Sequence, residues 1–261
     1  MELLVPGALV EIVGLLEPAL PVPEAEGVSP LNLNGQRAQL VSFDKGVKKW
    51  IATTFKGVDI SVDPKFIRPL TGEDLKDYDF VFGPKSDFDT VASQLTDVLA
   101  TKGYAVVRLF VADEEAEEVL STTRRLEEES QFSRLAVEFE RGYLGREGNA
   151  KTLLLDPSSS DAPSYVHGSA LSMIDHNFGA FSQMLAPYTE DALGFDIYSR
   201  TNLLLSLPLT EGEEDSYPPA DIDDTDVEGY FHTMARKKLS VLQFVGPQTN
   251  QLRLVPVGSS G

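Results

Sequence analysis

The stretch Glu138–Gly145 combines residue types that can do chemistry. It reads EFERGYLG, with carboxylates at Glu138 and Glu140 and with Tyr143 between two glycines. If the stretch forms a strand, the two carboxylates point to the same face, because side chains alternate with a period of two. Two carboxylates on one face can bind a cation or share a proton. The pattern therefore raises the question of a metal, acid–base or ligand site.

The same residues also fit a purely structural role. Gly142 and Gly145 permit a turn with positive φ, and Tyr143 and Leu144 would anchor that turn. The chain contains no phosphate loop G-x-x-x-x-G-K-[ST], no nucleophile elbow G-x-S-x-G and no zinc motif H-E-x-x-H. We therefore favour a structural turn over a partner- or ligand-binding loop, and we rank catalysis last.

The overall composition excludes several classes of site and partner. The 261 residues include 41 acidic and 22 basic side chains, which gives a formal net charge of −19. A chain this acidic repels phosphate backbones and anionic lipids, so we expect neither nucleic acid nor a membrane as a partner. The chain has no cysteine, which excludes disulfides, thiolate metal ligands and a cysteine nucleophile. A soluble intracellular protein is the favoured interpretation, and the pattern identifies no small-molecule ligand.

Residues 1–70 read as short strands separated by turn signals such as Asn34-Gly35 and Lys56-Gly57. We expect residues 17–30, which are rich in proline, to form an exposed loop after the first strand. The order of strands resembles that of small SH3-like barrels of the Tudor and KOW kind. This resemblance implies an aromatic ligand groove at Phe43, Trp50 and Phe55, although a packed core position is the favoured interpretation of the single tryptophan.

After a linker at residues 71–86, the period of the apolar residues changes. It predicts helices over 87–102, 112–130, 169–187 and 224–237, the last with a capping box formed by Thr225 and Glu228. Strands are predicted at 104–110, 151–156 and 199–209, and a hairpin over Gly246-Pro247 is predicted within 238–256. The domain at 87–261 is therefore predicted to be α+β.

Two segments of this domain resemble iron- and 2-oxoglutarate-dependent oxygenases. They are LATKGYAVVRLFVADEEAEEVL near its start and RKKLSVLQFVGPQTNQLRLVP at its end. The resemblance implies a jelly roll with N-terminal helices. Its iron site needs a histidine, a carboxylate two residues on, and a distal histidine. The matching place holds His232, Thr233 and Met234, and no histidine follows, so His232 is only a weak metal candidate and the jelly roll would be degenerate or truncated.

The opening motif fits the pattern E-x-E-x-G-Y-L-G at every fixed position. It resembles the N-terminal region of the single-domain, type-I-like polyketide synthases of dinoflagellates, where the pattern precedes a ketosynthase. A ketosynthase needs a cysteine nucleophile, which this chain lacks, so the condensing domain is absent here. The resemblance does not settle the role of this leader region. If the motif is a binding loop, its candidate residues are Glu138, Glu140, Gly142, Tyr143, Leu144 and Gly145.

Taken together, the sequence predicts an α+β protein in which an SH3-like β-barrel precedes the α+β domain. The favoured function is a non-catalytic accessory or docking region of a polyketide-synthase-like protein that binds protein partners or acyl carriers. We expect no cofactor and no enzymatic activity of this chain. The alternatives are a degenerate or incomplete oxygenase-like protein and an SH3-like adaptor whose groove lies at Trp50.

Overall fold

The computed structural model describes residues 4–15, 33–55, 57–71, 74, 77–109, 111, 113–145, 149–210, 212–246, 252 and 254. The chain divides into two compact units, and each is described here by itself. The first unit comprises Met1–Glu115 and Met173–Leu203, and the second comprises Ala116–Ser172 and Leu204–Gly261. The predicted boundaries at residues 70 and 86 remain predictions.

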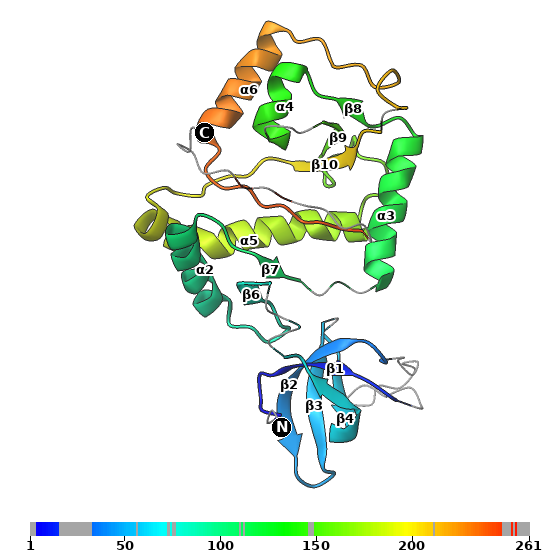
Figure 1. The fold of residues 1–261 in the computed structure, drawn as a ribbon, viewed down its shortest axis with the longest axis vertical. Helices are drawn as coiled ribbons and strands as arrows, with labels where there is room; N and C mark the ends of the chain where they lie inside the picture. Colours follow the sequence, from blue (N-terminus) through cyan, green and yellow to red (C-terminus); the bar gives the residue numbers. More distant parts are fainter. Residues whose placement is uncertain are drawn as a thin grey trace. The chain divides into compact units, whose positions relative to one another are not determined.

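The first unit contains a five-stranded antiparallel sheet in the order β4-β3-β2-β1-β5 (Figure 1). Its strands are β1 (Leu9–Ile12), β2 (Arg37–Asp44), β3 (Lys49–Thr54), β4 (Asp59–Val62) and β5 (Ile67–Pro69). The 3₁₀ turn η1 (Pro64–Phe66) joins β4 to β5. Among the described residues no pairing closes this sheet into a barrel.

One face of this sheet is apolar, as the alternating sequence predicts. In β1 and β4 every second residue is buried, and the buried set continues onto β2 and β3. The resulting core consists of Val10, Ile12, Leu33, Ala38, Leu40, Trp50, Ala52, Ile60, Val62 and Ile67. Trp50 is therefore a core residue, with only 6% of its surface exposed.

The rest of the first unit is mostly helical. It contains β6 (Phe80–Val81), α2 (Phe88–Lys102), β7 (Val107–Arg108) and most of α5 (Ala170–Leu193). Strands β6 and β7 pair in parallel. Helix α2 begins after Asp87, as predicted, and ends at Gly103, which adopts a φ of 80° and whose N–H bonds to the Leu99 carbonyl.

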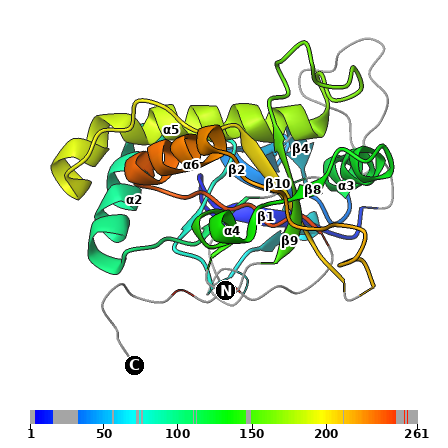
Figure 2. The same cartoon turned by 90° about the horizontal axis from the view of Figure 1, so that it is seen from above.

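The second unit packs helices with a three-stranded sheet in the order β10-β9-β8. Its elements are α3 (Asp113–Glu128), β8 (Ser133–Arg134), α4 (Val137–Leu144), β9 (Ala150–Leu155), β10 (Leu203–Pro208) and α6 (Asp224–Arg236). Strands β8 and β9 are antiparallel. The helices α4 and α6 lie side by side (Figure 1 and Figure 2), and aromatic contacts join them.

The motif forms neither the turn that we favoured nor the strand that we considered, because residues Val137–Leu144 form helix α4. The half-buried or buried positions are 139, 140, 142, 143 and 144, whereas 137, 138 and 141 are exposed, so one side of the helix is covered. The two glutamates, Arg141 and Leu144 are good helix formers. These propensities favour a helix despite the single glycine inside it, but a helix this short also needs tertiary contacts to be stable in water.

Two further predictions about the second half need correction. The capping box of α6 lies two residues earlier than predicted, because Asp223 and Asp226 accept hydrogen bonds from each other's backbone N–H at 2.8 and 3.2 Å. Aspartate caps a helix as well as threonine does. Residues 237–246, the described first part of the predicted hairpin, form no strand. The proline-rich segment 17–30 and the turn after Gly246 lie outside the described residues.

The fold is therefore mixed α+β, as predicted. In the part of the chain that the structure describes, no helix is long and apolar enough to cross a membrane.

The buried position of Trp50 leads to a first prediction. Replacing Trp50 by alanine is expected to lower the free energy of unfolding by about 3–5 kcal/mol, because it removes a large side chain from a packed core. Circular dichroism during denaturation measures this loss without needing tryptophan fluorescence. Phe43→Ala is the matched control, since Phe43 contacts the Trp50 ring but is 40% exposed. Equal effects of the two variants would contradict a core role of Trp50.

Candidate functional site

Glu138 and Glu140 do not form the pair of carboxylates on one face that a strand would produce. In helix α4, residues two apart do not face each other. Glu138 is exposed, whereas Glu140 is buried and accepts a hydrogen bond from Nε of Arg134 on β8 at 2.8 Å. The side chains of this ion pair are only 16% and 12% exposed. Glu140 therefore ties α4 to the sheet and is not paired with Glu138.

Gly142 is the point of closest approach between α4 and α6. A Cβ at this position would lie 2.7 Å from Cε2 of Tyr230 and 2.9 Å from Sδ of Met234. Carbon atoms in contact normally lie about 3.5–4.0 Å apart. No side chain fits at Gly142 unless α6 or its side chains move.

Aromatic rings on both helices surround this contact. The Phe139 and Tyr230 rings are stacked, with centroids 4.4 Å apart and planes 13° apart. Tyr143 contacts the same Tyr230 ring at 5.9 Å. These two ring contacts hold the Tyr230 ring against α4 near Gly142. The aromatic residue of the motif thus serves helix packing.

The C-terminal end of α4 is also fixed by the motif. Nζ of Lys237, which follows α6, donates a hydrogen bond to the Gly142 carbonyl at 2.9 Å. Such a cation at a helix C-terminus satisfies a carbonyl that has no partner within the helix. Gly145 follows with a φ of 96° and a ψ of −177°, a conformation that essentially requires glycine. Leu144, between these positions, is half-buried.

The described motif residues therefore fix the position of α6 and of the chain that follows it. That following segment is unusually apolar for an exposed one. Phe231 on α6 is 65% exposed, and Val241, Leu242 and Phe244 are 43%, 60% and 62% exposed. Arg236 and Lys238, which lie between Phe231 and Val241 in the sequence, are also exposed. The exposed side chains of α6 and of the segment that follows it are called the α6 surface, and they are Phe231, Arg236, Lys238, Val241, Leu242 and Phe244.

The predicted barrel groove is only partly assembled. Phe43 and Trp50 are register partners on β2 and β3, and their ring centroids are 5.3 Å apart. Phe55 follows the other end of β3, five residues and about 17 Å along an extended chain from Trp50. Since Trp50 is buried, the three rings do not form one open groove.

His232 lies exposed on α6. Within the described residues, no group of three or more His, Asp or Glu side chains is arranged to hold a metal ion. His167, another histidine, contacts the Pro157 carbonyl through Nδ1 at 2.9 Å. The described residues therefore provide no further ligands for a metal site at His232.

A buried lysine, Lys151, forms ion pairs with two carboxylates in the second unit, and no sequence pattern pointed to this cluster. Lys151 on β9 is 4% exposed, and its Nζ pairs with Glu127 of α3 and, at 2.6 Å, with Glu213. Burial lowers the pKa of Lys151, but the hydrogen bonds to both carboxylates outweigh burial and raise it. The amine is therefore protonated at neutral pH. It acts as a structural cross-link and not as a nucleophile.

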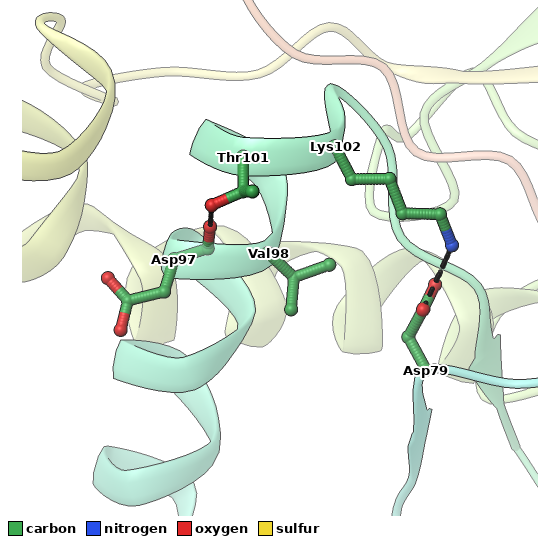
Figure 3. A pocket seen from close by; sticks show the side chains of 5 residues that line it. All are labelled: Asp79, Asp97, Val98, Thr101 and Lys102. Carbon is green, nitrogen blue, oxygen red and sulfur yellow. Dashed lines mark hydrogen bonds and ion pairs between the residues drawn. The ribbon is translucent and has the colours of Figure 1, made fainter.

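A shallow surface hollow of about 360 Å³ in the first unit is lined by Asp79, Asp97, Val98, Thr101 and Lys102 (Figure 3). Lys102 donates hydrogen bonds to both carboxylate oxygens of Asp79 at 2.9 Å. The Val106 N–H bonds to the same carboxylate, and together these bonds lower the pKa of Asp79. The polar groups at the rim thus satisfy one another, and the hollow presents no reactive pair.

Comparisons with protein-family models, with curated proteins and with solved structures gave no match for this chain.

The contact at Gly142 yields a second prediction. Gly142→Ala is expected to lower the free energy of unfolding by about 1–3 kcal/mol, because the added methyl group overpacks the contact with Tyr230 and Met234. Gly229→Ala on α6 is the matched control. Nothing lies within 4 Å of a Cβ at Gly229, so this change should stabilise the helix by up to about 1 kcal/mol. Equal denaturation midpoints for both variants would contradict the close approach of the helices.

The Lys151 cluster yields a third prediction. The hydrogen bonds from Lys151 and Thr210 lower the pKa of Glu213 from 4.5 to about 2. A carboxylate with a lowered pKa stabilises the folded state above its unfolded pKa and loses this contribution as the pH falls. Melting temperatures measured between about pH 4.5 and pH 2 should therefore fall more steeply for the native chain than for Glu213→Gln. Parallel curves would show that Glu213 does not contribute to acid stability.

Proposed function

We infer that the chain is a non-catalytic accessory or docking region of a polyketide-synthase-like protein, binding acyl carriers as protein partners. The motif resemblance supports this proposal, and so does the use of the motif residues in the structure. Glu140, Gly142 and Tyr143 are engaged in internal contacts that hold α6. A motif of this kind positions a surface and performs no chemistry itself.

The observation that carries the proposal is the exposed α6 surface. Its aromatic and aliphatic side chains are of the kind that anchor protein interfaces. Two exposed cations, Arg236 and Lys238, lie among them in a chain whose net charge is −19. Charge complementarity selects a partner that is acidic and that carries apolar side chains. An acidic acyl carrier domain has this chemistry.

For the fold of the first unit, we propose that the five-stranded sheet is an SH3-like barrel that is not closed between its described end strands β4 and β5. The strand order β4-β3-β2-β1-β5 and the 3₁₀ turn between β4 and β5 support this assignment. An SH3-like adaptor acting through Trp50 is less favoured, because that side chain is buried.

An oxygenase-like protein with a degenerate jelly roll remains the rival proposal. Neither the exposed His232 nor the strand-free described residues 237–246 favour it. Calorimetric titration with Mn²⁺ and 2-oxoglutarate distinguishes the two proposals. Saturable binding that is lost in His232→Ala would favour the oxygenase-like protein.

The docking proposal predicts the behaviour of substitutions in the α6 surface. Phe244→Ala should weaken binding of an isolated acidic acyl carrier domain by about tenfold or more, because it removes an exposed aromatic anchor. Arg236→Glu should slow association and reduce its dependence on salt. Isothermal calorimetry measures the first effect and stopped-flow mixing the second.

Leu154→Ala is the matched control for these variants. Leu154 on β9 is 59% exposed in the same unit but lies outside the α6 surface, so binding should not change. If the native chain does not bind the carrier domain at micromolar concentrations, or if Phe244→Ala binds as tightly as Leu154→Ala, the proposal fails.

A further inference from the structure

The hairpin between β2 and β3 presents a second unusual surface, in the other compact unit. Every residue from 41 to 49 is exposed. Val47 at the turn is 61% exposed, and Val41 and Phe43 are 38% and 40% exposed. A β-bulge between Leu40 and Ser42 marks the point where the hairpin leaves the packed part of the sheet. Bulges of this kind redirect side chains and are frequent at sheet edges and beside functional sites.

The hairpin tip is held in one conformation by its own side chains. Oδ1 of Asp44 accepts hydrogen bonds from the Gly46 N–H at 2.8 Å and from the Val47 N–H at 3.3 Å. At the base, the Phe43 ring packs on the buried Trp50 ring. A preorganised tip loses little conformational entropy when it binds a partner.

Lys48 adopts a conformation that a lysine rarely takes. Its φ is +56°, in the left-handed region that glycine and asparagine occupy more readily. Backbone strain of this kind is found where the surrounding structure or a function imposes it. A glycine or an asparagine would adopt this φ with less strain, but neither carries a charge.

Three lysines surround the apolar tip. They are Lys45, Lys48 and Lys49, against the single acid Asp44 in this stretch. Lys45 and Lys48 form no ion pair with the described residues, while Lys49 interacts electrostatically with Asp63. The tip is thus a local basic and apolar surface on a chain whose net charge is −19.

We propose that this hairpin tip is a docking site for an acidic peptide segment of a protein partner, with apolar side chains that contact Val47 and Phe43. The positive tip attracts carboxylates, and the exposed apolar side chains give a linear segment an anchor. A nucleic acid or a membrane surface fits less well, because either extends beyond the tip and meets the negative charge of the rest of the chain. The site is separate from the α6 surface, so the two proposals can fail independently.

Fluorescence anisotropy with the full chain tests this proposal. The probe is a short fluorescein-labelled peptide in which glutamates alternate with leucines, and the same peptide with lysines in place of glutamates is its control. Lys48→Asn is expected to weaken binding by about fivefold or more, because it removes one cation from the tip. Asparagine accepts a positive φ, so the melting temperature should be unchanged or higher. Lys48→Arg should restore binding.

Two further variants complete the test. Val47→Ser should weaken binding, while Lys65→Ala, which removes a 66% exposed lysine side chain elsewhere in the same unit, should not. Equal affinity of native chain and Lys48→Asn would overturn the proposal, as would equal binding of the lysine control peptide. Tighter binding to phosphatidylserine vesicles or to single-stranded DNA than to the acidic peptide would also overturn it, and would identify a membrane or nucleic-acid surface instead.

Discussion

The packing of α4 against α6 in the second unit depends on a glycine, Gly142. At Gly142 the backbone of α4 comes so close to Tyr230 and Met234 that a methyl group would not fit. This close approach allows the Phe139 and Tyr230 rings to stack and brings Lys237 within hydrogen-bonding distance of the α4 carbonyl. The direction in which the chain leaves α6 follows from these three contacts. A small residue at a helix crossing has a larger effect here than any charged residue of the motif.

The sequence predicted the first unit well and the motif poorly, for a physical reason. Strands β1 and β4 and the first half of β2 alternate between buried and half-buried residues, and alternation is the signal that a strand leaves in a sequence. The motif contains glycines, which disfavour a helix, together with good helix formers. Its sequence alone therefore does not decide between a turn and a helix. Only the tertiary contact with α6 decides this, since an isolated helix of this length is marginal in water. The residues on α6 that complete the contact are about 90 positions away in the chain, beyond the reach of a local pattern.

In the candidate site, too, features carried by neighbouring residues could be predicted, and features that combine distant segments could not. The basic residues at 236–238 are visible in the sequence, but the apolar residues that follow them are typical of a strand and predicted a hairpin. The structure exposes these side chains, and a sequence pattern cannot distinguish an apolar residue in a core from one on a docking surface. The Lys151 cluster was also invisible, because its partners Glu127 and Glu213 come from separate segments. The second unit therefore combines a buried, paired lysine with exposed cations that lie between apolar side chains in the sequence.

The pairing of β1 with β5 has a consequence for the synthesis of the chain. Val10 lies opposite Pro69, so the first strand cannot complete its hydrogen bonds until the last strand has left the ribosome. Closing a loop of this length costs entropy before any pairing is gained, and contacts between distant residues form slowly. While the chain emerges, one edge of β1 has no neighbour and can pair with another nascent strand. The three residues of β5 therefore cover the free edge of β1 and replace it with a shorter edge strand.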